Sequence, residues 1–221
     1  MNKNFNLETK LNNTFIENNI SVDQQQGLHT YLNLLKNKDI PTYTHSLRVG
    51  ILASYIGKFL HLDSKALLYA GLLHDIGKTL IMKETLQKTD KFDEKDYEEI
   101  QNHTEYSYRI LRDIYPFSAD IAIRHHYYQD RGYPETLPAY NKPYSKATRA
   151  TIDFYAMIVS LADFYDAATT RINDKHGEKR KLTATEIKTL MLEKHPHFTK
   201  LIEYLYHDNI FEDEPSDHPT K

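Results

Sequence analysis

The chain has 221 residues, a formal net charge of −3 and no cysteine. This length suits one domain with a substantial core. The weak negative charge argues against a binder of long nucleic acids and against a polybasic membrane surface. Without thiols, any bound metal must be held by His, Asp or Glu. No apolar run approaches the roughly 20 residues that span a bilayer, and the polar N-terminus does not resemble a signal peptide, which predicts a cytoplasmic protein.

Apolar side chains recur at helical spacing along most of the chain, and glycine is scarce, with seven residues in all. This pattern predicts an all-α protein. The expected helices cover 23–38, 44–60, 63–77, 93–114, 118–128, 151–169, 183–194 and 198–208.

The same pattern divides the chain into four parts. Residues 1–40 are expected to form an N-terminal extension of one or two helices, packed on the core or on a second subunit of a homodimer. A core is expected over 41–180, followed by C-terminal helices over 181–210 that pack on it. The polar end, 211–221, is expected to be disordered.

Several predicted helices carry histidine or aspartate on the stripe that should face the core. These candidates are His45, His74, Asp75, His103, His125, His126 and Asp163. A divalent ion takes about four to six ligands, so the set is large enough for two ions that share a carboxylate and a water.

Each candidate also has an ordinary alternative when it is considered alone. A single histidine on a helix stripe is more often a hydrogen-bonded core residue than a ligand. The pair His74–Asp75 could cap a helix end, and Asp163 could be solvated. Without a metal, a separate structural explanation would be needed for the candidates on each of five helices. A shared metal centre explains all of them at once and is therefore favoured.

The order H…HD…H…HH…D is similar to that of a known family. Together with LLHDIGK at 72–78, HHYYQDRGYP at 125–134 and ADFYDA at 162–167, it resembles the HD-GYP subgroup of the HD phosphohydrolase superfamily. The resemblance covers about residues 40–180 and implies a compact all-α HD-domain bundle with its metal site between helices. It implies that the seven candidates hold two divalent ions, with Asp75 as their bridge. Iron or manganese is favoured, and zinc is compatible with the ligands.

The resemblance also implies contacts with a substrate. Lys78 matches a lysine that is expected to touch a substrate phosphate, and Arg171 is the nearest match to a family arginine, with the spacing one residue short. Gly132, Tyr133 and Pro134 match the GYP motif, which in the family is linked to contacts with diguanylate cyclases. The ring of Tyr133 is also a candidate for stacking on a base.

The chain departs from the family pattern near the expected substrate site. Tyr127 replaces a glutamate, and the loop after it is one residue shorter. Pro41 occupies the position of a glutamate that holds a third metal in some members, so two metals are expected. The segment between GYP and ADFYDA is longer than usual around AYNKPYSKATRAT, residues 139–151.

The expected function is therefore a metal-dependent phosphodiesterase that hydrolyses a cyclic dinucleotide, with cyclic di-GMP as the leading candidate. In this scheme a hydroxide that bridges the two ions attacks phosphorus. Three alternatives stay open. The chain could be an HD phosphohydrolase for another nucleotide or phosphomonoester, or a metal-containing module that docks a diguanylate cyclase through the GYP loop. The third is a helical protein whose histidines bind no metal.

Overall fold

The computed structural model describes residues 3–88, 92–172 and 180–211. This part of the chain forms α-helices and two short 3-10 helices, with no strand among its elements, so the all-α prediction is confirmed. The elements are α1 (Lys3–Glu17), α2 (Val22–Lys38), α3 (Ile40–Phe59), α4 (Ser64–Leu73), η1 (Ile76–Leu80), α5 (Lys83–Leu86), α6 (Glu94–Gln101), α7 (His103–Leu111), α8 (Pro116–Ala122), α9 (Lys146–Thr170), α10 (Ala184–Lys194), η2 (Pro196–Phe198) and α11 (Thr199–His207).

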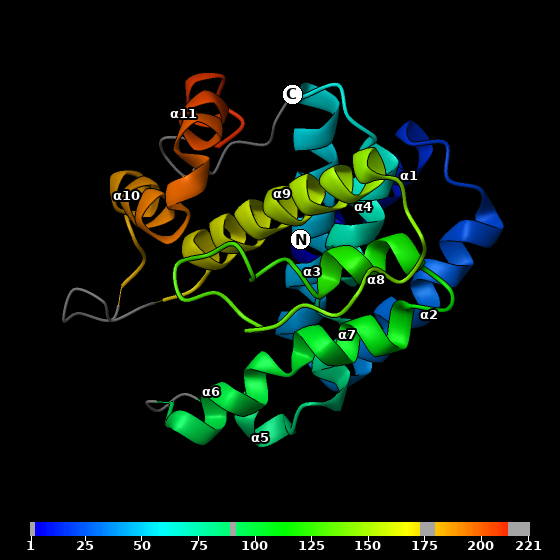
Figure 1. Ribbon diagram of the computed structural model, residues 1–221, viewed down its shortest axis with the longest axis horizontal. Helices are drawn as coiled ribbons and strands as arrows, with labels where there is room; N and C mark the ends of the chain where they lie inside the picture. The colour runs from blue at the N-terminus through cyan, green and yellow to red at the C-terminus, as the bar shows by residue number, and fades with distance from the viewer. Residues whose placement is uncertain (1–2, 89–91, 173–179, 212–221) are drawn as a thin grey trace.

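The longest helix, α9, runs across the molecule (Figure 1). The C-terminal helices α10 and α11 gather at one side, and α1 and α2 lie at the other. Although α9 has 25 residues, neither it nor any other helix in the described ranges has the length and apolar character needed to cross a membrane.

Helices α3 and α4 cross at a pair of glycines, Gly50 and Gly71. A Cβ atom added to Gly71 would lie 2.7 Å from the Cα of Gly50, so a larger residue would separate the two helices. Because the helices approach so closely, the rings of His45 and His74 come within 5.5 Å of each other. The crossing thus brings two of the candidate ligands together.

Two buried apolar clusters hold the helices in place. One joins α9 to α3, α4 and the C-terminal helices, and the other joins α1 and α2 to α3, α4 and α8. Burial of apolar surface at about 25 cal/mol per Å² is the main stabilising term in such a bundle. The candidate ligands lie on α3 and α9 and on the ends of α4, α7 and α8, so both clusters position them.

Several helix bounds differ from the predictions. The predicted helix over 93–114 is two helices, α6 and α7, which meet at Asn102, the C-cap of the first and the N-cap of the second. The apolar spacing continues through this break, so it gives no sign of it. The predicted helix over 63–77 begins as expected after the cap Asp63 but ends at Leu73, and η1 replaces its last turn.

The helix expected over 118–128 begins earlier, at Pro116, because proline suits the first turn, where no N–H is needed. It also ends earlier, at Ala122. The helix expected from residue 151 begins at Lys146, since the Ser145 side chain accepts the Thr148 N–H at 3.1 Å and caps it.

The predicted tail over 211–221 begins one residue too early. Phe211 is fully buried, and its ring stacks on Tyr165 at 4.6 Å. Residues 212–221 lie outside the described residues. The C-terminal helices themselves pack on α9, and Ile202 of α11 belongs to its core cluster.

Candidate metal centre

The turn between α4 and η1 carries His74 and Asp75 and packs tightly on α7. The N–H of Gly77 donates to Oγ of Ser107 at 2.8 Å, and that hydroxyl donates to the carbonyl of His74 at 2.8 Å. A Cβ atom on Gly77 would lie 2.0 Å from the carbonyl oxygen of His103. Glycine is therefore required at this position for α7 to bring His103 up to the turn.

The structure brings all seven candidate ligands into one buried centre between the helices. Its ligand atoms form three overlapping groups, in each of which the atoms lie within 4.8 Å of one another. The groups are His45–His74–Asp163, His74–Asp75–His125 and His103–His125–His126.

Asp75 lies between the two outer groups of the centre. Its Oδ1 is 3.2 Å from Nε2 of His103, and its Oδ2 is 3.4 Å from Nε2 of His74. Among the described residues, Oδ1 of Asp75 and Nε2 of His74 are buried polar atoms without a hydrogen-bond partner. Such atoms are costly to bury, and a cation in the centre would satisfy them. The residues present therefore fit a metal.

Backbone carbonyls orient three of the imidazoles. In each case Nδ1 donates to the carbonyl three residues earlier, so that Nε2 is left to point into the centre. The bonds are His74 to Gly71 at 2.7 Å, His103 to Ile100 at 2.6 Å and His125 to Ala122 at 2.6 Å.

A carboxylate orients the fourth imidazole, and sequence reasoning missed it. Nδ1 of His45 lies 2.6 Å from Oδ2 of Asp166. Arg48 also donates two hydrogen bonds to this carboxylate, from Nη2 to Oδ2 at 2.9 Å and from Nε to Oδ1 at 2.5 Å. The sequence feature that could have identified Asp166 is its spacing: it is the second aspartate of ADFYDA and lies three residues after Asp163, on the same helix face.

Burial and local charge set the protonation of the centre. Burial lowers the pKa of His103 to about 4 and that of His126 to about 3. Burial alone would raise the pKa of Asp75, but interactions with the neighbouring His74 and Lys78 side chains hold it well below its usual range. Neutral imidazoles beside an ionised carboxylate are the form that binds a cation.

His45 behaves differently from the other histidines. Burial opposes its protonation, yet hydrogen bonds to Asp163 and Asp166 raise its pKa above the ordinary value. Its Nε2 lies 2.9 Å from Oδ1 of Asp163. In the metal-free protein, a proton on His45 thus balances the negative charge of Asp163 and Asp166. A bound cation would balance that charge instead.

The predicted substrate residues lie at different distances from the centre. Nζ of Lys78 is 2.6 Å from Oδ2 of Asp75, at the edge of the centre. The ring of Tyr133 lies 4.6 Å from that of His126. Arg171 is exposed at the C-cap of α9, and no contact within the described residues joins its side chain to the centre.

The GYP loop folds back on the residues that precede it. A Cβ atom on Gly132 would lie 2.3 Å from the carbonyl oxygen of Tyr127, so the loop needs glycine there. The side chain of Tyr127 is partly exposed.

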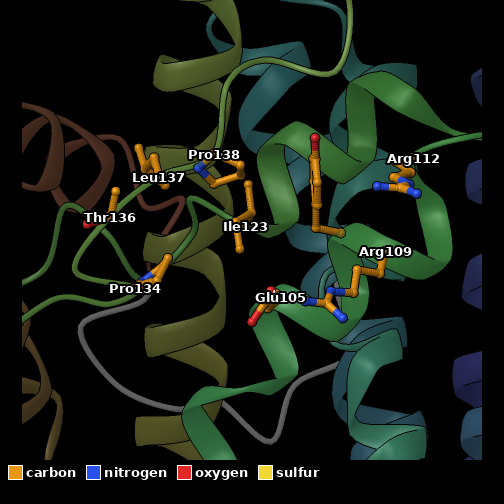
Figure 2. A pocket seen from close by; sticks show the side chains of 9 residues that line it. Glu105, Arg109, Arg112, Ile123, Pro134, Thr136, Leu137 and Pro138 are labelled. Carbon is orange, nitrogen blue, oxygen red and sulfur yellow. Dashed lines mark hydrogen bonds and ion pairs between the residues drawn. The ribbon is translucent and has the colours of Figure 1, made fainter.

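Beyond this loop, a groove of about 550 Å³ lies between α7 and residues 134–138 (Figure 2). Glu105, Tyr108 and Arg109 line one side, and Pro134, Leu137 and Pro138 line the other. The groove contains none of the seven candidate ligands, so it is separate from the centre.

Residues 42–168 match the family model of the HD domain. The chain is 32% identical to the 3′3′-cGAMP-specific phosphodiesterase 1 of Vibrio cholerae, over 70% of this chain and 35% of that protein. It is 30% identical to a cyclic di-GMP phosphodiesterase of Thermotoga maritima, over 72% of this chain and 43% of that protein. The chain thus spans less than half the length of these curated relatives.

A solved structure shares the fold. The HD domain of the L. monocytogenes phosphodiesterase PgpH aligns with a TM-score of 0.51 and 23% identity, covering 84% of this chain and 88% of that one. The same domain in complex with cyclic-di-AMP aligns with a TM-score of 0.50. At this identity the likeness shows the fold alone.

Proposed function

The chain belongs to the HD domain family, and from this premise we propose that it is a metal-dependent phosphodiesterase of the HD-GYP subgroup. The proposed reaction is the hydrolysis of a cyclic dinucleotide. The observation that carries the proposal is the position of Asp75, whose two carboxylate oxygens lie toward two different histidine groups. A carboxylate placed in this way suits the bridge between two cations.

The proposed ligands are the seven candidate residues of the centre, six of them buried and His126 half-buried, and the proposed cofactors are two divalent ions. Imidazole and carboxylate ligands without thiolate suit iron, manganese or zinc, and the subgroup favours iron or manganese. Pro41 lies in the first turn of α3 and offers no ligand atom for a third ion. When bound, such ions offset the charge of phosphoryl oxygens and acidify water.

The side chains around the centre supply the remaining contacts. We assign Lys78 to a phosphate oxygen of the substrate, because its ammonium group lies at the edge of the centre beside Asp75. Tyr133 is proposed to hold a base, because its ring already borders the centre at His126. Arg171 is the proposed second phosphate contact, as a bidentate donor.

The choice of substrate is supported by the relatives. Their names give cyclic di-GMP and 3′3′-cGAMP as substrates, and the structural neighbour was solved with cyclic-di-AMP. We therefore propose a cyclic dinucleotide as the substrate class and cyclic di-GMP as its leading member.

The GYP loop is the proposed contact for a diguanylate cyclase. The partly exposed Tyr127 and the groove beside Pro134 support a docking role for this face of the molecule. If docking is the whole function, the protein should hold metal and show no turnover.

The test is product analysis on the purified protein, loaded anaerobically with iron(II) or with manganese. The panel contains cyclic dinucleotides, linear dinucleotides and mononucleotides, with Asp75→Asn as the control. Cleavage of a cyclic dinucleotide by the wild type alone supports the proposal. Turnover of another nucleotide alone would assign the chain to a different phosphohydrolase activity. Bound metal without any turnover would assign it to the docking role.

A further inference from the structure

The long segment between the GYP loop and α9 is bonded to three helices that carry candidate ligands of the metal centre. We call residues 135–145 the strap. It runs past the ends of α7 and α8 before α9 begins at Lys146. Figure 2 shows Leu137 and Pro138 of the strap beside Ile123, at the end of α8. The strap contains most of the insertion found in the sequence.

A buried arginine joins the strap to α8. Arg124 precedes the His125–His126 pair directly and is only 2% exposed. Its Nη1 donates to the carbonyl of Asp120 at 2.9 Å, and its Nη2 donates to the carbonyl of Pro138 in the strap at 3.5 Å. The guanidinium carbon lies 4.1 Å from the ring centroid of Tyr140, also in the strap.

Two buried or half-buried carboxylates offset the charge of this arginine. Nη1 of Arg124 lies 3.3 Å from Oδ1 of the fully buried Asp120, and Nε lies 3.4 Å from Oδ1 of Asp153 on α9. The same carboxylates hold the strap. Asp120 accepts the N–H of Asn141 at 3.1 Å and 3.2 Å, and Asp153 accepts the hydroxyl of Tyr140 at 2.9 Å. Arginine, carboxylates and strap therefore form one hydrogen-bonded unit.

The strap also reaches α7. The side-chain amide of Asn141 donates to the carbonyl of Arg112, just after α7. The hydroxyl of Tyr108 donates to the carbonyl of Ala139 at 3.5 Å. One short segment is thus bonded to α7, α8 and α9.

These three helices carry four of the seven candidate ligands, and they carry them at their ends or on their core face. His103 begins α7, His125 and His126 follow α8, and Asp163 lies on α9. We propose that Arg124 is a positioning residue, which ties the strap across these helices and so holds the His125–His126 pair in place for metal. This inference rests on the proposed function, because it assigns the centre to metal.

Arginine suits this task better than lysine. Its planar guanidinium stacks on an aromatic ring and donates in several fixed directions at once, whereas an ammonium group acts as a point charge. Arg124 uses both properties, with Tyr140 on its face and carboxylate and carbonyl oxygens at its edge. The Arg124→Lys change keeps the charge and loses this geometry.

The test compares Arg124→Lys and Tyr140→Leu with a control in the full chain. The control is a change at Ile202, a fully buried residue of α11, made to valine or alanine to match the thermal midpoint of the strap variants. The measurements are calorimetric titration with Mn²⁺, the electron paramagnetic resonance spectrum of the bound Mn²⁺, and hydrogen exchange of residues 123–128 in the metal-free protein.

We expect both strap variants to bind one of two Mn²⁺ ions about tenfold more weakly, because changes in the residues that orient ligands typically cost 10–100-fold in affinity. The spectrum should shift from that of a coupled pair toward that of a single ion, and exchange at 123–128 should rise. The Ile202 control should retain wild-type affinity, spectrum and exchange.

Folded strap variants with wild-type affinity and wild-type exchange at 123–128 would overturn the inference. An effect of equal size in the Ile202 control would overturn it as well, since general destabilisation would then explain the result. If the wild type binds Mn²⁺ but cleaves no cyclic dinucleotide, the proposed activity fails while the affinity and exchange data still decide the role of Arg124. If the wild type binds no Mn²⁺, the metal assignment and this inference fail together.

Discussion

Asp75 and His103 lie on different elements, yet Oδ1 of the first is 3.2 Å from Nε2 of the second. The approach depends on Gly77, because η1 rests directly on the backbone that begins α7. The HDIGK turn thus carries two of the candidate ligands, and its glycine lets the backbone of His103 approach them.

Gly77→Ala should therefore damage both stability and metal binding. The new methyl group would lie 2.0 Å from the carbonyl oxygen of His103 and 2.5 Å from the backbone nitrogen of Ser107. Both are backbone atoms, so the backbone of α7 would have to move away from η1 to relieve the overlap. Overpacking of this kind costs about 1–3 kcal/mol of unfolding free energy. Urea denaturation should show a lower midpoint, and calorimetry should show weaker binding of Mn²⁺.

Gly57→Ala is the matched control for this change. Its methyl group would lie 2.6 Å from Cδ1 of Leu67, the end of a side chain, and 3.1 Å from the nearest backbone atom, Cα of Ser64, so the cost should be smaller than at Gly77. Equal losses of stability and of metal affinity in the two variants would contradict the role given to Gly77.

The metal-free protein should lose stability as the pH falls from about 6.5 toward 4. The folded pKa of His103 is lowered to about 4 and that of His126 to about 3, from an ordinary value of 6.5. In this window the unfolded chain binds more protons than the folded one, so protonation favours unfolding. The stability from these neutral imidazoles is present above pH 6.5 and is lost as the pH falls. Thermal midpoints measured from pH 7.5 to pH 4 should decrease across this range.

His45 acts in the opposite direction. Its folded pKa is raised, so its stabilising contribution is present below pH 6.5 and is lost as the pH rises through the folded value. Asp166→Asn removes one of the three carboxylates that raise this pKa and should weaken the loss of stability above pH 6.5. If the wild type and Asp166→Asn show the same dependence of the thermal midpoint on pH, the role given to His45 is contradicted.

Helix pattern and the family resemblance together predicted that the seven candidate residues meet, since each of them lies on a helix face or at a helix end with a distinct spacing. It did not find Asp166 or Arg124. A charged residue beside a histidine is normally solvated, and only the folded chain shows that Arg124 is buried among Asp120, Asp153 and the strap. The break at Asn102 was also missed, because the apolar period continues across it.

Tyr133→Leu should weaken substrate binding more than metal binding. The ring borders the centre at 4.6 Å from His126 but is not one of the candidate ligands. Base stacking on an aromatic ring is worth about 1–3 kcal/mol, so KM for the cyclic dinucleotide should rise about tenfold or more. Steady-state kinetics with saturating Mn²⁺ measures the change, and metal content provides the control. A loss of bound Mn²⁺ equal to the loss of activity would instead give Tyr133 a structural role.

Asp166→Asn tests whether the orientation of an imidazole matters to the centre. The amide oxygen of asparagine can still accept the Nδ1 proton of His45, so the ring should keep its place. The negative charge that makes the imidazole a stronger ligand is lost, and such changes typically lower metal affinity 10–100-fold. Mn²⁺ titration followed by calorimetry should show this loss for one ion of the pair.

Arg48→Met separates the effect of the carboxylate from that of its other partner. Arg48 is about one-third exposed and bonds only to Asp166 in the described part of the chain, so its removal leaves the charge on Asp166 in place beside His45. We expect this variant to bind Mn²⁺ within about threefold of the wild type, because the ligand-orienting carboxylate remains. If Arg48→Met weakens Mn²⁺ as much as Asp166→Asn does, the ion pair as a whole orients His45. If neither change weakens it, the hydrogen bond from His45 to Asp166 serves folding and has no part in holding metal.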